Sequence, residues 1–338
     1  MLEKIRSRSS RRRIQQSRLA LLLEERIIGQ PNVADLIVPH FHMFQAHLSP
    51  PGRPAGIFLL LGPTGVGKTR TVEALAELIH GSDRHLLRID CGEYQMDHEV
   101  AKLIGAPPGY LGHRETQPLL TQARLSSVTS PHCDLSLVLF DEVEKAAPSL
   151  TRLLLGVLDK ATLRLGDNTT ANFERSMIFM TSNVGAAEMA RAMGPGYGFQ
   201  GAGDAESKRA QLENVVMRAV RKRFAPEFLN RIDAIVHYGP LDQEALEKIL
   251  DYQLRQLQRH IVERLRDRAF RIHVTPGARK FLLSRGTSPE YGAREIRRTV
   301  HREIVQPLAA LMVEEYLEPG GTVVVELSRN GELHLRQA

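Results

Sequence analysis

The 338-residue sequence has little of what marks several classes of protein. Its only two cysteines, Cys91 and Cys133, supply neither a disulfide framework nor a set of metal ligands, so we expect reduced, packed thiols in a cytoplasmic protein. No apolar run approaches the roughly 20 residues that cross a bilayer, and no apolar signal core stands near the N-terminus, so neither a membrane span nor export is expected. Hydrophobic residues make up 42% and charged residues 25%, which is typical of a globular protein with an ample core.

A modest basic excess gives the chain a formal net charge of +6. Part of it lies in six arginines near the N-terminus, Arg6, Arg8, Arg11, Arg12, Arg13 and Arg18. Such a segment can bind the phosphates of a nucleic acid. Because no aromatic residues are interleaved with these arginines for base stacking, we favour a solvated basic arm and helix over residues 1–24.

The most specific pattern is a phosphate-binding motif, G-x-x-x-x-G-K-[ST], at Gly62-Pro63-Thr64-Gly65-Val66-Gly67-Lys68-Thr69. Its glycines let backbone N–H groups turn towards phosphate oxygens, and the helix that follows adds the positive end of its dipole. Lys68 is expected to meet the β- and γ-phosphates, and the Thr69 hydroxyl to bind Mg²⁺. The apolar run 57–61 predicts a buried strand before the motif, and the apolar spacing over residues 72–79 predicts a helix after it.

Two further predicted strands end in polar residues. The run 136–140 is followed by Asp141 and Glu142, and the run 176–181 by Asn183 shortly afterwards. Ligands of α/β folds gather at the carboxyl edge of the sheet, so Asp141 is expected to hold Mg²⁺ and Glu142 to deprotonate the attacking water. Two acids can also mark a helix start, and Asn183 on its own is only a turn residue.

The positions of glycine and proline and the spacing of apolar residues indicate two loops before residue 241 and a second domain after it. Two prolines and three glycines in residues 105–112 exclude a helix or central strand there. Residues 185–208, rich in Gly, Ala and Met, are expected to form a mobile loop. Beyond residue 241 the pattern predicts helices over 246–265, 278–283 and 293–311, the last bent at Pro307, a strand over 271–274, and a terminal hairpin of strands 322–327 and 332–335.

On these residues the chain resembles the second ATPase module of the Clp disaggregases and unfoldases, such as ClpB and ClpC, within the AAA+ ATPases. The resemblance runs from about residue 25 to 328, in a short single-module form. It is carried by seven segments in family order: Ile28-Gly29-Gln30, the motif at 62–69, Gly105-Ala106-Pro107-Pro108-Gly109-Tyr110, Asp141-Glu142-Val143-Glu144-Lys145, Thr181-Ser182-Asn183, Phe228-Leu229-Asn230-Arg231-Ile232-Asp233 and Tyr291-Gly292-Ala293-Arg294.

The resemblance implies an α/β fold in two parts. A P-loop AAA+ parallel sheet with flanking helices is expected over residues 25–240, followed by a smaller helical lid domain with a short sheet over 241–338. One departure from the family is that the segment between Gly112 and Asp141 is several residues longer than the usual pattern.

The resemblance also implies roles for single residues. Ile27 and Ile28 look like contacts to adenine, and Asn183 looks like the sensor-1 residue. Arg231 looks like the arginine finger that reaches the γ-phosphate in the neighbouring subunit, and Arg294 like sensor 2 on the lid. Tyr110, with Leu111 beside it, looks like the pore-loop aromatic that grips a polypeptide.

These roles together imply an ATP- and Mg²⁺-dependent motor that forms a homo-oligomeric ring, hexameric by family, and threads unfolded or aggregated polypeptide through a central pore. The alternative is an AAA+ nucleic-acid motor or loader that uses the basic N-terminus. An aromatic flanked by glycine in the pore loop favours peptide, since a DNA translocase would have Lys or Arg there. Tyr197-Gly198-Phe199 resembles the tripeptide by which some Clp ATPases dock on the ClpP peptidase, although a glycine-rich linker with packed aromatics is the simpler interpretation.

Overall fold

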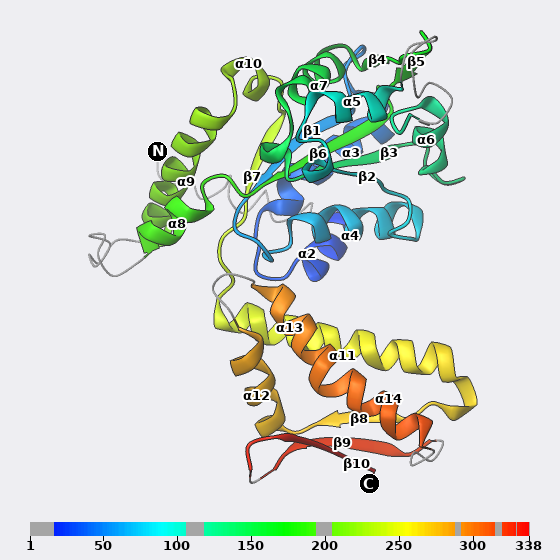
Figure 1. The fold of residues 1–338 in the computed structure, drawn as a ribbon, viewed down its shortest axis with the longest axis vertical. Helices are drawn as coiled ribbons and strands as arrows, with labels where there is room; N and C mark the ends of the chain where they lie inside the picture. The colour runs from blue at the N-terminus through cyan, green and yellow to red at the C-terminus, as the bar shows by residue number, and fades with distance from the viewer. Residues whose placement is uncertain are drawn as a thin grey trace, which may run out of the picture. The chain divides into compact units, whose positions relative to one another are not determined.

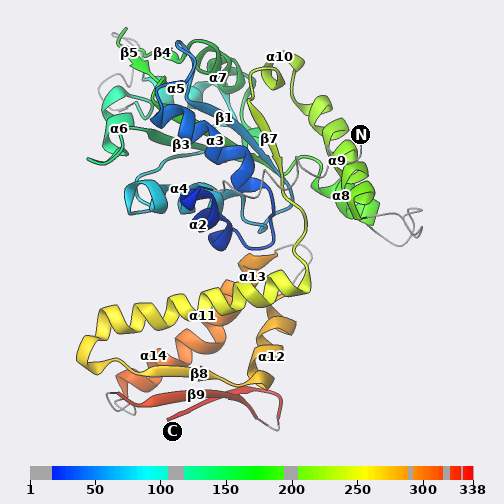
Figure 2. The same ribbon diagram turned by 180° about the vertical axis from the view of Figure 1, so that it is seen from behind.

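The computed structural model describes residues 17–105, 118–193, 205–287, 292–314, 320–328 and 330–337, with only the backbone described for residues 193 and 205–211. It divides into two compact units, Met1–Pro63 with Gly67–Gly239, and Pro240–Ala338 with Thr64–Val66 (Figures 1 and 2). The greater part of the basic arm expected over residues 1–24 lies outside the described residues, which begin just before helix α2, Arg18–Arg26.

The first unit is built on a five-stranded sheet with the order β2-β3-β6-β1-β7, in which every neighbouring pair is parallel. Its strands are β1 Gly56–Leu61, β2 Leu87–Asp90, β3 Ser136–Asp141, β6 Ser176–Ser182 and β7 Ala234–His237. The three central strands β3, β6 and β1 are buried at every position, as parallel strands covered on both faces must be. The predicted strands are therefore confirmed, and their carboxyl ends meet at one edge.

Helices cover both faces of this sheet (Figures 1 and 2). They are α3 Val33–Gln45, α4 Lys68–His80, α5 Asp97–Ile104, α6 Gln122–Ser127, α7 Pro148–Lys160, α8 Ala186–Met193, α9 Ala205–Arg223 and α10 Pro226–Leu229. Alternate residues of β1 point to opposite faces. Leu59 belongs to the core that contains Leu150 and Leu154 of α7, whereas the ring of Phe58 contacts His40 of α3.

The loop expected over residues 185–208 is wrong at residues 186–193 and 205–208, which are helical. Helix α8 takes up residues 186–193, and α9 begins at Ala205, while residues 194–204 lie outside the described residues. Alanine and methionine are strong helix formers, and the glycines of this stretch lie outside the two helices. A two-stranded ribbon of β4 Thr162–Arg164 and β5 Thr170–Asn172 was also not predicted.

The second unit is a smaller helical domain with a three-stranded sheet of order β10-β9-β8. Its elements are α11 Gln243–Leu265, β8 Arg271–Val274, α12 Pro276–Gly286, α13 Ala293–Val300, α14 Gln306–Val313, β9 Thr322–Leu327 and β10 Leu333–Gln337. The predicted terminal hairpin is confirmed as the antiparallel β9–β10 pair, and β8 adds parallel to β9. The helix expected over 293–311 is interrupted by a π-helical turn, His301–Val305, just before Pro307, which has no N–H to donate.

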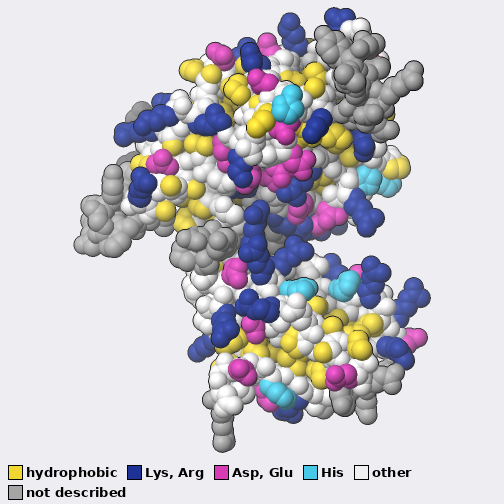
Figure 3. Space-filling view, viewed as in Figure 1, with side chains coloured by type: hydrophobic (Ala, Val, Ile, Leu, Met, Phe, Trp, Pro, Cys, Tyr) yellow, Lys and Arg dark blue, Asp and Glu magenta, His cyan; other side chains and the backbone are white. Residues whose placement is uncertain are grey.

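The two units together confirm the expected fold class, a parallel sheet with flanking helices followed by a helical domain with a short sheet. Within the described ranges, no helix is both long and apolar enough to cross a bilayer. On the face shown in Figure 3, basic and acidic side chains are interspersed over the first unit, so the positive net charge is not gathered into one patch there.

A buried histidine connects α4 to the loop that follows α6. His80, in the last turn of α4, is 8% exposed, and its Nδ1 lies 2.9 Å from the Ser130 hydroxyl. A hydrogen bond to the backbone of Leu135 favours the protonated ring, but its effect on the pKa is smaller than that of burial. Burial, reinforced by the neighbouring His85, lowers the pKa of His80 to about 4.

We therefore expect the free energy of unfolding to fall as the pH falls from about 6.5 towards 4. In that pH range His80 is protonated in the unfolded chain but neutral in the folded chain. Between pH 7 and pH 5 this difference lowers the free energy of unfolding by about 1–2 kcal/mol. Urea unfolding at both pH values should show a smaller loss for His80→Asn than for the parent. His132→Asn, an exposed histidine two residues from Ser130, is the control, and equal losses in all three proteins would contradict the assignment.

Candidate functional site

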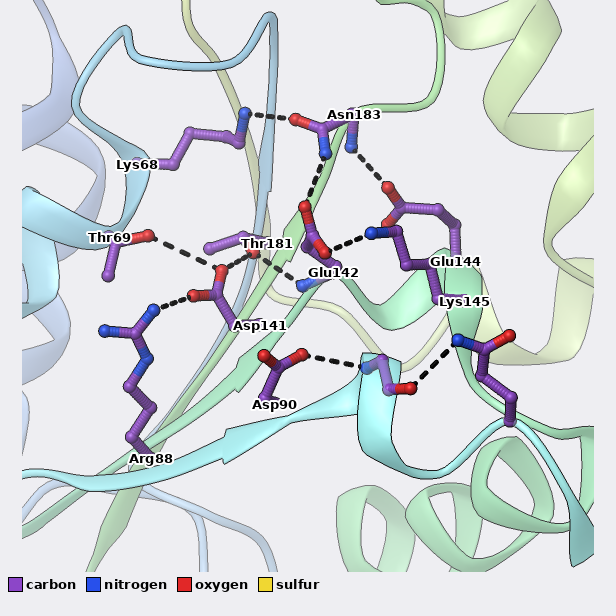
Figure 4. A network of polar contacts seen from close by, with 12 residues as sticks. Lys68, Thr69, Arg88, Asp90, Asp141, Glu142, Glu144, Lys145, Thr181 and Asn183 are labelled. Atoms are coloured by element: carbon purple, nitrogen blue, oxygen red, sulfur yellow. Dashed lines mark hydrogen bonds and ion pairs between the residues drawn. The ribbon is translucent and has the colours of Figure 1, made fainter. Parts of the chain in front are cut away.

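Polar side chains from three segments meet at the carboxyl edge of the sheet (Figure 4). Lys68 and Thr69 come from the start of α4, and Asp141 ends β3. Glu142 follows β3, and Asn183 follows β6. Because β1, β3 and β6 are adjacent and parallel, residues more than 100 positions apart in the chain become neighbours here.

The turn from β1 into α4 requires glycine at two places. Gly62 has φ +154°, and a Cβ there would lie 2.6 Å from the carbonyl oxygen of Tyr238. Gly67 has φ +109° and stands at the N-cap of α4, where it has no side chain to accept the first N–H groups of the helix. The buried Tyr238 hydroxyl lies 2.7 Å from the Thr71 hydroxyl and fixes the first turn of α4 to the end of β7. The helix start is thus held in place with donors suited to an anion.

The ammonium group of Lys68 is turned back onto the loop that precedes it. It donates to the carbonyl oxygens of Gly62 at 2.6 Å and Pro63 at 2.7 Å, and to Asn183 Oδ1 at 2.9 Å. Three partners match the three N–H donors of an ammonium group. Lys68 therefore fills its hydrogen-bonding capacity within the protein and can meet an anion only by exchanging these partners.

Asp141 is 7% exposed and receives hydrogen bonds on both carboxylate oxygens. Oδ1 accepts from the hydroxyl groups of Thr181 and, at 3.5 Å, Thr69, and Oδ2 accepts from Arg88 at 2.5 Å. The paired oxygens of Thr69 and Asp141 are the hard donors that Mg²⁺ prefers. No cluster of three or more His, Cys, Asp or Glu side chains within the described residues is placed to hold a metal ion by itself.

Glu142 sits in a backbone conformation that is rare for a residue with a side chain, with φ +57° and ψ +50°. Its N–H donates to the Thr181 hydroxyl at 2.9 Å, which fixes the turn that leads into a 3₁₀ turn, Val143–Lys145. Its two carboxylate oxygens contact different donors, Asn183 Nδ2 at 3.3 Å and Lys145 Nζ at 2.6 Å. The hydrogen bond to Glu142 raises the pKa of Lys145, so the lysine is cationic at neutral pH.

Asn183 is held on three sides. Besides its contacts to Lys68 and Glu142, its backbone N–H donates to Glu144 Oε1 at 3.0 Å. A single amide side chain thus accepts from the lysine of the loop and donates to the carboxylate that follows β3 (Figure 4).

The two cysteines are free, as expected for packing thiols. Burial, together with the nearby carboxylate of Asp90, raises the pKa of Cys91 to about 12, and burial also raises the pKa of Cys133. Neither thiol is thereby activated as a nucleophile.

Arg231 lies at the opposite edge of the sheet from the glycine-rich loop 62–69. Its Nε is 3.3 Å from Asp159 Oδ1, and one terminal nitrogen donates to the Glu227 carbonyl oxygen at 2.7 Å. It precedes β7, which pairs in parallel with β1 so that Ala234 is opposite Phe58, whereas Gly62 follows the far end of β1. From Ile57 to Gly62 the strand advances by five residue steps, or about 16 Å. The structure therefore does not bring Arg231 to Lys68 or Glu142 of its own chain.

The other predicted site residues are placed as follows. Ile27 is buried at the C-cap of α2, and Ile28 is half-buried. Gln30, two residues after Ile28, exchanges two hydrogen bonds with the backbone of Gly239. Arg294 is exposed in the first turn of α13 in the second unit. Tyr110, Leu111 and the tripeptide Tyr197-Gly198-Phe199 lie outside the described residues.

Three contacts at the site were missed by sequence reasoning, those of Arg88, Thr181 and Lys145. Arg88 lies in β2, which alternates apolar and charged residues, and Thr181 lies in the buried strand β6. Only the pairing of β2 and β6 with β3 places them beside Asp141. A polar residue at the end of an otherwise apolar strand is the signal that could have indicated Thr181.

Two family models match the chain. One is described as "AAA domain (Cdc48 subfamily)" and covers residues 53–235, and the other as "C-terminal, D2-small domain, of ClpB protein" and covers residues 241–325. The chain is 35% identical over 309 residues to "Chaperone protein ClpB 1" of Nostoc sp. (strain PCC 7120), covering 91% of this chain and 33% of that protein. It is 39% identical over 306 residues to "Chaperone protein ClpB" of Pseudomonas putida, covering 90% and 33%.

Among solved structures, the chain resembles a closed-state cryo-electron microscopy reconstruction of Hsp104 with ATPγS and FITC casein. The TM-score is 0.78 at 29% sequence identity, and the match covers 94% of this chain and 51% of that one. The chain thus spans about a third of the length of the ClpB relatives it matches.

Proposed function

The chain belongs to the AAA ATPases and carries the small C-terminal domain characteristic of ClpB, and we propose that it is an ATP-driven protein unfoldase or chaperone motor. The observation that carries the proposal is the meeting of Lys68, Asp141, Glu142 and Asn183 at one sheet edge, beside a loop whose glycines leave the start of α4 open to an anion. A non-hydrolysing scaffold would have no need for this set of groups.

For nucleotide binding we assign residues 62–69 to the phosphates and Ile27 and Ile28 to the adenine. Lys68 gives up its present partners, the two carbonyl oxygens of the loop and the amide oxygen of Asn183, and takes phosphate oxygens in their place. Thr69 and Asp141 together are suited to hold Mg²⁺, which would supply charge neutralisation to the phosphates.

For hydrolysis we assign Glu142 as the general base. A water oxygen forms the new bond to the γ-phosphorus, the bond from that phosphorus to the ADP oxygen breaks with its electron pair going to ADP, and the water proton passes to Glu142. The products are ADP and inorganic phosphate. Asn183, already within hydrogen-bonding distance of Glu142, is suited to orient the water or the γ-phosphate.

The active site would be completed between subunits. Arg231 stands at the sheet edge away from its own phosphate loop, so as an arginine finger it would serve the neighbouring protomer of a ring, hexameric by family. Residues 25–240 form the proposed ATPase domain. Residues 241–338 form the proposed lid, on which Arg294 acts as the sensor-2 residue.

The polypeptide substrate would be gripped by Tyr110 and Leu111 in a central pore, and docking on a ClpP-like peptidase through Tyr197-Gly198-Phe199 is a subordinate proposal. Tyr110→Ala should leave ATP turnover largely intact while ATP-dependent unfolding of a tailed fluorescent protein falls at least about tenfold, because an aromatic contact worth about 1.4 kcal/mol is lost. Tyr110→Phe keeps the ring and should unfold the substrate at the parent rate. If Tyr110→Ala unfolds the substrate as fast as the parent, the threading mechanism is wrong.

A further inference from the structure

The carboxylate of Glu142 is held by two donors that differ in what else they contact. Asn183 Nδ2 reaches Oε1 at 3.3 Å, and the same amide accepts from Lys68 at 2.9 Å through Oδ1. Lys145 Nζ reaches Oε2 at 2.6 Å and has no further ion pair among the described residues. One oxygen is therefore linked to the loop that would bind phosphate, and the other is linked to a side chain only three residues along.

The contact at Oε1 depends on where Lys68 points. Lys68 must exchange partners to meet a phosphate, and Asn183 loses an interaction when it does. The amide is then able to turn away from Glu142, which leaves Oε1 without a donor. An unpaired carboxylate oxygen is what a general base needs to accept a proton from water.

The contact at Oε2 does not depend on Lys68. Lys145 ends the 3₁₀ turn that begins after Glu142, and its backbone N–H donates to the Glu142 carbonyl oxygen at 2.9 Å. The backbone of Glu142 is fixed in turn by its N–H bond to Thr181. The lysine and the glutamate are thus parts of one short, closed turn, and their ion pair can persist while Asn183 moves.

We propose that Lys145 is a positioning residue for Glu142: it holds Oε2 in place so that Oε1, once released by Asn183, faces the attacking water. The inference rests on the proposed function of Glu142 as the base. Lys145 touches neither nucleotide nor water in this role and acts only through Glu142. Its removal should therefore slow the chemical step and leave nucleotide binding unchanged.

The ion pair has a matched control elsewhere in the chain. Lys248 and Glu244 on α11 make an exposed pair with the same 2.6 Å separation and the same residue types, one helical turn apart in the second unit. Exposed pairs contribute little to stability, and both lysines are about half exposed or more. Neither substitution is expected to change thermal unfolding measurably, so a loss of activity confined to Lys145 would be specific to the site.

The experiment compares the steady-state ATPase of the parent, Lys145→Gln, Lys145→Arg and Lys248→Gln in the full chain. We expect Lys145→Gln to lower kcat about tenfold, a part of the 10²–10⁴-fold that a positioned base contributes, with KM for ATP within about twofold of the parent. Lys145→Arg should restore most of the loss, because a guanidinium group can also hold one carboxylate oxygen. Lys248→Gln should match the parent.

A second measurement separates positioning from a general disturbance of the fold. In the background of Glu142→Gln, which binds ATP through the same loop, the further change Lys145→Gln should leave the affinity for a fluorescent ATP analogue unchanged. The role of Lys145 would be overturned if Lys145→Gln kept the parent kcat. It would also be overturned if the added Lys145→Gln change lowered the affinity for the ATP analogue by as much as it lowers kcat. Either result would leave the ATPase proposal intact. A parent protein whose ATP hydrolysis does not depend on Glu142 would overturn both.

Discussion

Glu142→Gln should stop ATP turnover while ATP binding persists. The amide has the shape of the carboxylate and can still accept a hydrogen bond from Lys145, but it cannot take a proton from water. Because a positioned general base contributes about 10²–10⁴-fold, we expect kcat to fall at least a hundredfold. Phosphate release measures kcat, and a fluorescent ATP analogue measures the dissociation constant, which should stay within a few fold of the parent.

Lys68→Ala provides the contrast, because it removes the charge that we propose meets the phosphates, and it should abolish binding itself. Glu93→Gln, an exposed acid in the 3₁₀ turn after β2, is the matched control and should hydrolyse ATP as the parent does. Since Glu142→Gln holds ATP without consuming it, mass photometry at saturating ATP should show a persistent ring. Turnover by Glu142→Gln within tenfold of the parent would mean that another group removes the proton.

The part of the site that could be predicted from sequence is the part that motifs encode locally. A glycine-rich turn between an apolar strand and an amphipathic helix predicts Lys68 and Thr69 without knowledge of the sheet. Acids directly after an apolar run predict Asp141 and Glu142 in the same way. Parallel strand order then explains why these residues meet.

The partners of these residues could not be predicted, because they depend on register between distant strands and on one strained turn. Arg88 reaches Asp141 only because β2 pairs with β3 with Asp90 opposite Asp141. Lys145 returns to Glu142 because the backbone of Glu142 adopts positive φ, a conformation that its residue type does not suggest. Helices α8 and α9 were missed for another reason. The glycines between them indicate a loop, whereas the alanines within them favour helix, and the prediction followed the glycines.

Arg231→Ala should also abolish ATP turnover. Because the sheet separates Arg231 from the loop 62–69 of its own chain, the test must show in which subunit the arginine acts. An arginine finger contributes about 10³–10⁵-fold in other phosphoryl-transfer enzymes, so we expect kcat to fall at least a hundredfold. Arg231 also pairs with Asp159, so the melting temperature must be measured to show that Arg231→Ala is folded. Loss of activity alone would not separate a finger that acts on the neighbouring subunit from one that acts within its own.

Mixing two inactive variants distinguishes an arginine that acts on the neighbouring subunit from one that acts within its own. In a ring that contains Arg231→Ala and Glu142→Gln subunits, some interfaces combine an intact Glu142 from the first with an intact Arg231 from the second. With random assembly at equal amounts these are about a quarter of the interfaces, so the mixture should regain a measurable part of the parent turnover. About 16 Å of strand lies between the end of β1 that Arg231 flanks and the phosphate loop of the same chain. Rescue is therefore the expected result, and its absence at every mixing ratio would mean that Arg231 has a structural role at the amino edge of the sheet.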